Sequence, residues 1–344
     1  MGYRELAAAA RGYMGPVCKA CPTCNGRACG GGVPGPGAKG SGTVAIRNFE
    51  AWERWRLVMD TLYASDGSDP DPSCDFLGRR LSLPLMVAPL GDVHRHYGDE
   101  LDDLDYNGMV LRAAKAEGTL AWTGDGLRPE VHECACGLIA GLGGAGIPTI
   151  KPWSMGAVLK KLEPALAAHP AAVAMDVDGA GLPFLRGQQP PAGPKDVAQL
   201  RELADACHGA GVPFVAKGIL GPRGALKALE AGVDAIVVSN HGGRVLDGVP
   251  ATAEVLPSVV DAVGGELCVL VDGGIRSGVD LFRALALGAD AALVCRPVAV
   301  AAFGGGEEGV RAYLAQLRVE LVDAMAMCGA RGVAEVTRDM LLEA

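Results

Sequence analysis

The sequence predicts a (β/α)8 barrel, a TIM barrel, preceded by a cysteine-rich N-terminal extension. After about residue 80, eight short runs are continuously apolar, as expected of strands buried on both faces of a parallel sheet. Stretches with helical periodicity separate these runs, and several of them end at a glycine. Eight strand–helix units over roughly 215 residues match the size of a (β/α)8 barrel. A doubly wound open sheet is the alternative, although it rarely needs eight such units.

The predicted elements follow one another regularly along the chain. The strands are expected at residues 83–90, 118–124, 147–153, 171–178, 212–219, 234–240, 267–274 and 291–297. Helical patterns include 196–211, 222–232 and 278–288, and a last helix is expected at about 306–328, outside the barrel. We therefore divide the chain into an N-terminal Cys/Gly-rich segment with the lead-in to the barrel (1–80), the barrel (81–330) and a C-terminal tail (331–344).

One segment departs from this alternation of strands and helices. Residues 179–195, after the fourth strand, are rich in glycine, proline and glutamine. Because this segment follows the carboxyl end of a strand, it lies on the face of the barrel that carries the chemistry. It is expected to be either a lid over the site or a solvated loop.

Composition excludes several classes of protein. The 344 residues carry a formal charge of -9, and 49 % of them are hydrophobic, which indicates a globular chain. An acidic chain with few aromatic residues is a poor partner for nucleic acid. No run of about 18 apolar residues and no signal peptide are visible, so we expect a cytoplasmic protein without a membrane partner. With no export signal, the eleven cysteines are not expected to form a disulfide framework.

Polar residues gather where the predicted strands end, which is where (β/α)8 barrels carry their chemistry. These residues are Thr123, Lys151, Asp176, Asp178, Lys217, His241, Asp272 and Arg296. The clearest motif is VVSNHGGRVLD at 237–247, in which two glycines separate His241 from Arg244. A histidine titrates near neutral pH and suits a general base, whereas the planar guanidinium of an arginine suits a carboxylate. The alternative is a His–Arg pair that only holds the loop together.

The last strands indicate a phosphate site. DGGIRSG (272–278) and CRP (295–297) end the seventh and eighth strands, whose loops often bind phosphate in this fold. Backbone amides near Gly273 and Gly274, together with Arg276 and Arg296, suit a phosphomonoester. Lys217 is interpreted as a Schiff-base nucleophile, as a cation beside an anionic ligand, or as an ion-pair partner of Asp176. FMN and pyridoxal phosphate both fit these residues.

Together, AKGIL, VVSNHGGRVLD and VDGGIRSGVDLFRALALGAD resemble the FMN-dependent α-hydroxy-acid dehydrogenase/oxidase family, which includes glycolate oxidase and lactate oxidase. The resemblance covers most of residues 45–330. It implies that His241 is the catalytic base and that Arg244 binds the substrate carboxylate. It also implies contacts with FMN, which we assign to Lys217, Ser239, Asp272, Gly273, Gly274, Arg276 and Arg296, and to Pro89, Thr123 and Thr149 at the ends of the first three strands.

The chain departs from the family on the substrate side. Thr149 and Lys151 stand where the family has a glutamine and a tyrosine, and Asp176 stands where it has a threonine. The second substrate arginine has no counterpart in register, since Arg186 is displaced. The cysteine-rich segment lies roughly where the family has an N-terminal tyrosine. These departures predict a different, more charged contact with the substrate.

The predicted function is therefore the oxidation of a 2-hydroxy acid or related alcohol by an FMN enzyme. His241 would take the proton, and hydride equivalents would pass to the flavin. Two alternatives are an FMN-dependent isomerase of the type 2 isopentenyl-diphosphate kind and a non-catalytic flavin- or metal-binding sensor. The predicted partners are a small-molecule substrate, a redox partner and, from the resemblance, further copies of the chain in a homo-oligomer.

Four cysteines near the N-terminus lie outside the resemblance. Cys18, Cys21, Cys24 and Cys29 are spaced C-x2-C-x2-C-x4-C. This spacing suits an iron–sulfur cluster or a tetrahedral zinc ion, and the third interpretation is reduced or redox-pairing thiols without a metal.

Overall fold

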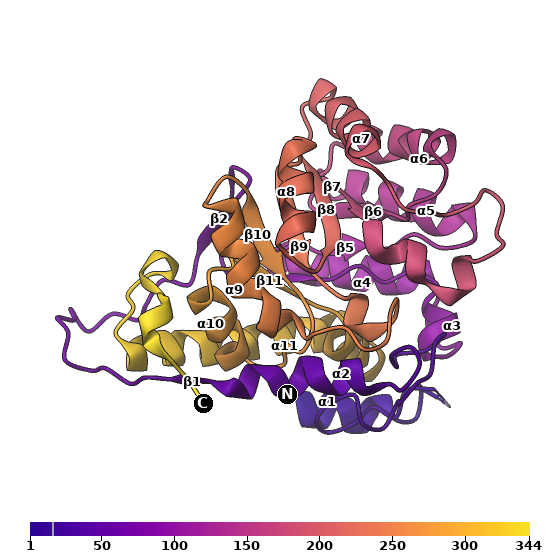
Figure 1. Cartoon of the computed structure of the whole chain (residues 1–344). Helices are drawn as coiled ribbons and strands as arrows, with labels where there is room; N and C mark the ends of the chain where they lie inside the picture. Colours follow the sequence, from indigo (N-terminus) through magenta and orange to yellow (C-terminus); the bar gives the residue numbers. More distant parts are fainter. Residues whose placement is uncertain (16) are drawn as a thin grey trace.

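The computed structural model describes residues 1–15 and 17–344 (Figure 1). Its main sheet has eight parallel strands in the order β4-β11-β10-β9-β8-β7-β6-β5. The N–H of Val87 donates to the carbonyl of Leu120 (3.0 Å), and a bridge between Val87 and Ala121 joins the two outer strands. The sheet is thereby closed into the predicted barrel. The strands are β4 (Leu85–Val87), β5 (Trp122–Thr123), β6 (Ile147–Ile150), β7 (Val173–Asp176), β8 (Phe214–Ile219), β9 (Ala235–Val238), β10 (Cys268–Val271) and β11 (Ala291–Val294).

Burial on both faces explains why these strands are continuously apolar. Met86, Val215 and Leu270 pack in a cluster inside the barrel, whereas their neighbours in the chain pack in the larger cluster beneath the helices. The short hairpin of β2 (Cys74–Phe76) and β3 (Arg79–Leu81) adds Phe76 and Leu81 to the inner cluster. The interior is therefore filled with side chains, and room for a ligand is left only at the ends of the barrel.

Helices surround the barrel and alternate with its strands (Figure 1). They are α3 (Val93–Tyr97), α4 (Asp103–Ala116), α5 (Pro129–Gly141), α6 (Met155–Ala167), α7 (Val197–Gly209), α8 (Pro222–Glu230), α9 (Thr252–Val263), α10 (Gly278–Ala286) and α11 (Arg296–Cys328). The last helix begins at Arg296, not near residue 306, and it is kinked at Gly306 (φ 59°). No helix within the described residues is long and apolar enough to cross a membrane.

The N-terminal residues pack against the barrel as a compact layer. Helix α1 (Tyr3–Ala10) contacts α11, and α2 (Thr43–Glu50) lies close to the loop that follows β9. Between these helices, the Lys39 N–H donates to the carbonyl of Gly243 (2.8 Å), and the Lys39 ammonium donates to the carbonyls of Gly181 and Val245. The segment between α1 and α2 therefore lies over the end of the barrel where the carboxyl ends of the strands meet.

The chain end and the 179–195 segment are also packed. Strand β12 (Leu341–Glu343) pairs antiparallel with β1 (Trp55–Leu57). The 179–195 segment begins within the short helices η2 (Val177–Gly181) and η3 (Pro183–Leu185). Leu182 and Leu185 are buried, and the ring of Phe184 lies 5.8 Å from that of His96. The first part of this segment thus covers the carboxyl end of the barrel.

Candidate active site

Two adjoining cavities lie at the carboxyl end of the barrel. The larger, of about 630 Å³, is lined by most of the residues predicted from the sequence to hold a cofactor: Pro89, Lys217, Asp272, Gly273, Gly274, Arg276 and Arg296. The smaller, of about 360 Å³, is lined by residues that include His96, Lys151, Asp176, Leu182 and Phe184. His241, Arg244 and Pro89 line both cavities. The predicted base and the predicted carboxylate ligand therefore stand at the boundary between the two.

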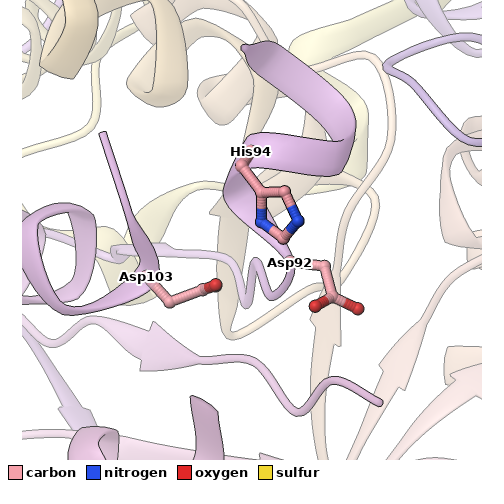
Figure 2. A group of neighbouring side chains, drawn as sticks. All are labelled: Asp92, His94 and Asp103. Carbon is pink, nitrogen blue, oxygen red and sulfur yellow. The ribbon is translucent and has the colours of Figure 1, made fainter. Parts of the chain in front are cut away.

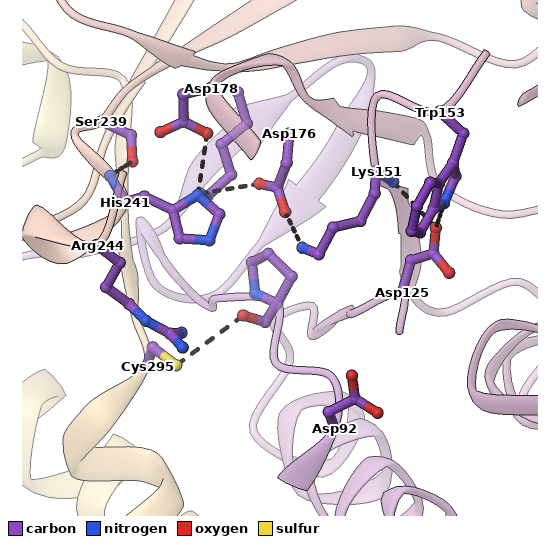
Figure 3. A network of polar contacts seen from close by, with 12 residues as sticks. Asp92, Asp125, Lys151, Trp153, Asp176, Asp178, Ser239, His241, Arg244 and Cys295 are labelled. Carbon is purple, nitrogen blue, oxygen red and sulfur yellow. Dashed lines mark hydrogen bonds and ion pairs between the residues drawn. The ribbon is translucent and has the colours of Figure 1, made fainter. Parts of the chain in front are cut away.

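His241 is held in a fixed orientation. Its Nδ1 lies 2.9 Å from Oδ1 of Asp178, and its backbone N–H donates to the Ser239 hydroxyl (3.0 Å; Figure 3). The His241 and Asp178 side chains are only 12 % and 11 % exposed. With the Asp178 carboxylate accepting the Nδ1 proton, the lone pair of the imidazole lies on Nε2. The pair therefore has the arrangement of a general base and its orienting carboxylate.

The glycines between His241 and Arg244 are required by the space around the loop. Gly242 and Gly243 have φ values of 64° and 84°. A Cβ on Gly242 would lie 2.6 Å from the Arg296 guanidinium, and one on Gly243 would lie 2.8 Å from the side chains of Ala38 and Val44. Only glycine combines this backbone with this packing. The tight turn brings His241 and Arg244 to the same cavities.

Arg244 is half-buried beside a histidine that no sequence motif indicates. Its Nη2 lies 3.2 Å and 3.3 Å from the two ring nitrogens of His96, which comes from α3. Burial lowers the pKa of His96 to about 2, and the charge of Arg244 adds to this effect, so the imidazole is neutral. The Arg244 Nε is buried and has no partner among the described residues. Because Arg244 lines both cavities, its guanidinium is placed to bind an anion there.

Asp176 joins two buried lysines. Its carboxylate lies 3.1 Å from Nζ of Lys151 and 3.0 Å from Nζ of Lys217, and Lys217 is also 3.5 Å from Asp272. Figure 3 shows Asp176 between Lys151 and His241. Burial alone would raise the pKa of Asp176, but the two ammonium groups outweigh it and hold that pKa well below its usual range. Burial opposes the charge on Lys217, but the nearby carboxylates, Asp176 first, raise its pKa. Lys217 thus makes the ion pair given above as one of its interpretations, and it also lines the larger cavity.

A second unpredicted residue, Asp125, organises the neighbouring strand end. Its carboxylate accepts hydrogen bonds from the Lys151 N–H (3.1 Å) and the Trp153 indole (2.7 Å). It also accepts one from the Lys161 ammonium (2.9 Å). These three hydrogen bonds fix the Asp125 carboxylate, and one of them holds the backbone of Lys151 in place. Asp125 follows a strand end, so the rule that found Asp176 and Asp178 could have found its position, but not its partners.

The residues of the larger cavity fit a phosphorylated flavin. Gly273 and Gly274 have φ values of 93° and 87°, and a Cβ on Gly274 would lie 1.8 Å from the carbonyl of Asn48. Such a turn leaves backbone amides free beside the guanidinium groups of Arg276 and Arg296, which suits a phosphate. Three residues predicted to contact the cofactor, Thr123, Thr149 and Ser239, are buried and do not belong to the lining of the two cavities. The hydroxyls of Thr123 and Thr149 have no partner within the described chain, whereas the Ser239 hydroxyl accepts the His241 N–H.

A separate group of potential ligands lies beside this site. Asp92, His94 and Asp103 have ligand atoms within 4.8 Å of one another (Figure 2). Both carboxylates already accept backbone hydrogen bonds, Asp92 from Leu127 and Asp103 from Val93, and Asp103 also pairs with Arg128 (3.4 Å). These contacts give the carboxylates a structural role, and we assign no metal to the group.

The carboxyl end of this (β/α)8 barrel carries a His–Asp pair, an arginine beside it, and a group of glycines and arginines. These features are typical of a barrel enzyme that binds a phosphorylated cofactor. The family model described as FMN-dependent dehydrogenase matches residues 36–182 and 167–343. The chain therefore belongs to the FMN-dependent dehydrogenase family, which confirms the resemblance seen in the sequence.

Several characterised proteins are similar to this chain. An L-lactate dehydrogenase of Pseudomonas aeruginosa (strain LESB58) is 46 % identical over 148 residues, which are 43 % of this chain and 37 % of that protein. An L-lactate oxidase of Roseobacter sp. (strain GAI101) is 49 % identical over 140 residues, 41 % of this chain and 38 % of that protein. These matches thus span less than two fifths of each relative's length.

Solved structures match over nearly the whole chain. A variant of mandelate oxidase with 2-hydroxy-phenylacetamide has a TM-score of 0.79 and 29 % identity, covering 99 % of this chain and 97 % of the other. A mutant of mandelate oxidase with a monooxide FMN adduct has a TM-score of 0.72 and 31 % identity, covering 89 % and 93 %. The barrel predicted from the sequence is confirmed by these neighbours.

Proposed function

We propose that this chain is an FMN-dependent oxidoreductase that oxidises a 2-hydroxy acid to the corresponding 2-oxo acid. The observation that carries the proposal is the position of His241, oriented by Asp178 and placed beside Arg244 at the boundary of the two cavities. A base next to a carboxylate-binding arginine is what this substrate class requires.

Each residue has a defined task in this proposal. Arg244, which lines both cavities, binds the substrate carboxylate with its guanidinium. His241 takes a proton from the substrate at Nε2, and the Asp178 carboxylate stabilises the resulting imidazolium. Leu182 and Phe184 cover the smaller cavity and exclude water from it. FMN, when bound, supplies the acceptor for the two electrons of the oxidation.

Most of the residues proposed to hold FMN line the larger cavity. Arg276, Arg296 and the amides near Gly273 bind its phosphate. Lys217 remains cationic because of Asp176 and Asp272, and it places positive charge where the cofactor gains negative charge. The remaining proposed contacts are Pro89, Thr123, Thr149, Ser239 and Asp272.

The smaller cavity is the proposed place for the substrate side group. Lys151 and Asp176 are paired there, His96 is neutral, and the ring of Phe184 covers one side. The cavity thus offers both an apolar wall and buried polar groups.

The cytoplasmic location, the homo-oligomer, the redox partner and metal binding by the four cysteines stay predictions.

An anaerobic absorption titration tests the proposed function. The purified protein should show the flavin bands, and one acid of a panel that includes L-lactate and mandelate should bleach them. Flavin that stays oxidised with every acid would contradict the proposal and favour the sensor interpretation. Protein that binds no FMN after reconstitution would contradict the cofactor assignment itself.

Replacing Arg244 by methionine should lower kcat/KM for the acid about 10- to 150-fold, because a charge-assisted contact of roughly 1.5–3 kcal/mol is lost. Steady-state kinetics at constant FMN occupancy measure this effect. Arg186→Met is the matched control, since Arg186 is exposed on the 179–195 segment. Equal losses in the two variants would show that Arg244 has no specific role in binding the substrate.

A further inference from the structure

The loop that carries the four N-terminal cysteines contacts a residue of the proposed cofactor cavity. Arg276 lines that cavity, and its Nε donates to the carbonyl of Cys24 (2.6 Å). Pro36, which follows the cysteines by a few residues, lines the same cavity. Cys18 is buried in the main core. The cysteine loop is thus anchored on the barrel at the end where FMN is proposed to bind.

The four thiols are free and closely spaced along the chain. None of them is in a disulfide, although all four fall within 12 residues, 18–29. Cys18 is buried and the other three are half-buried, and the Cys29 thiol lies 3.5 Å from the carbonyl of Gly26. Unpaired, sheltered thiols at this spacing are a suitable ligand set for one metal centre.

Close packing and positive φ angles fix the backbone conformation of the cysteine loop. Ala20 is fully buried at φ 42°, and its N–H points at the Cys18 sulfur (3.5 Å). Gly26 has φ 83°, and a Cβ there would lie 2.9 Å from the backbone of Ala45. N–H···S contacts are among the interactions that tune iron–sulfur centres. The turns between the cysteines are therefore fixed by packing rather than left to solvent.

Two arginines contact the backbone of the cysteine loop. Arg276 Nε donates to the carbonyl of Cys24 (2.6 Å), and Arg11 Nε donates to that of Ala20 (3.3 Å). Four thiolates bound to a metal centre leave it with a net negative charge, which nearby guanidinium groups stabilise. Arg276 would thus serve two neighbours, the cofactor phosphate on one side and the cysteine centre on the other.

We propose that Cys18, Cys21, Cys24 and Cys29 bind an iron–sulfur cluster of the four-iron type. The C-x2-C-x2-C start of the motif matches the spacing of such clusters. A cluster also fits the position, because it can exchange electrons with a flavin, which a zinc ion cannot. This second argument depends on the proposed function, whereas the spacing of the cysteines does not.

The proposed cluster defines how electrons leave the site. Oxidation of one 2-hydroxy acid to a 2-oxo acid releases two electrons and two protons. The protons go to water, one of them through His241. The two electrons would pass singly through the cluster to two molecules of a one-electron carrier protein, each of which is reduced once.

Metal and sulfide analysis of the anaerobically purified full chain tests the proposal. We expect about four iron and four sulfide per chain, and an electron paramagnetic resonance signal after reduction with dithionite. Zinc without sulfide would overturn the cluster, and so would thiols without any metal after reconstitution with iron and sulfide. FMN measured in the same sample separates the two proposals: FMN without iron contradicts only the cluster, and iron without FMN contradicts only the proposed function.

A pair of variants assigns the ligands. Cys21→Ser/Cys24→Ser should lose the iron and the signal but keep FMN, because the barrel residues hold the cofactor. Cys134→Ser is the matched control, since Cys134 is exposed on α5, and it should keep the iron. Full iron content in the double variant would overturn the assignment. An acid that bleaches the flavin of the unmodified chain without producing the cluster signal would overturn the electron route.

Discussion

Replacing His241 by asparagine should lower the rate of flavin reduction by a 2-hydroxy acid about 10²- to 10⁴-fold, the usual contribution of a general base. His241 has φ 55°, a left-handed conformation that asparagine tolerates better than most residues. The loop should therefore keep its shape, and FMN should remain bound. Stopped-flow absorption under anaerobic conditions measures the rate with the acid that bleaches the unmodified protein.

A second His–Asp pair in the same chain provides the control. His208 lies 2.7 Å from Asp234, and its side chain is 41 % exposed on the outer surface. His208→Asn removes an imidazole from a similar His–Asp pair away from the two cavities, so the rate should be unchanged. If both variants reduced flavin as fast as the unmodified chain, His241 would not be the base. If both were slow, the effect would be structural.

The barrel could be predicted from the sequence because each strand is buried on both faces. A continuous apolar run indicates a strand with no solvent-exposed face. Eight such strands, each followed by a helix, are most commonly arranged as a closed (β/α)8 barrel. The predicted start of α11, at about residue 306, was wrong because Arg296 and Pro297 were interpreted as the end of a strand. Proline is favoured in the first turn of a helix, and here it lies in that turn.

The candidate site could be predicted only in part. Residues at strand ends, such as Lys217 and His241, follow from the rule that the carboxyl ends of parallel strands meet. The contacts between His96 and Arg244 join residues 148 positions apart, and no periodicity in the sequence indicates such a contact. The same is true of Lys39, whose contacts bring the N-terminal segment over the barrel. Fold topology places residues on a face, whereas packing decides which of them touch.

Replacing Asp176 by asparagine should destabilise the FMN-bound protein by about 3–5 kcal/mol, the usual cost of removing one partner of a buried ion pair. Asparagine keeps the volume but leaves the ammonium groups of Lys151 and Lys217 without their shared countercharge in a site that is almost fully buried. Urea unfolding followed by circular dichroism measures the change. The control is Asp71→Asn, which breaks an exposed ion pair with Arg80 and should change stability by only about 0–1 kcal/mol.

The pH dependence of this difference distinguishes lost charge from altered packing. The folded pKa of Asp176 lies below its unfolded value of about 3.9, so its charge stabilises the fold above that pH, and the contribution is lost as the pH falls. The difference between the unmodified chain and Asp176→Asn should therefore be nearly constant from about pH 5 to 8 and should shrink below about pH 4. A difference that persists unchanged at low pH would mean that asparagine disturbs the packing. No difference at neutral pH would mean that the two lysines do not need Asp176 as their countercharge.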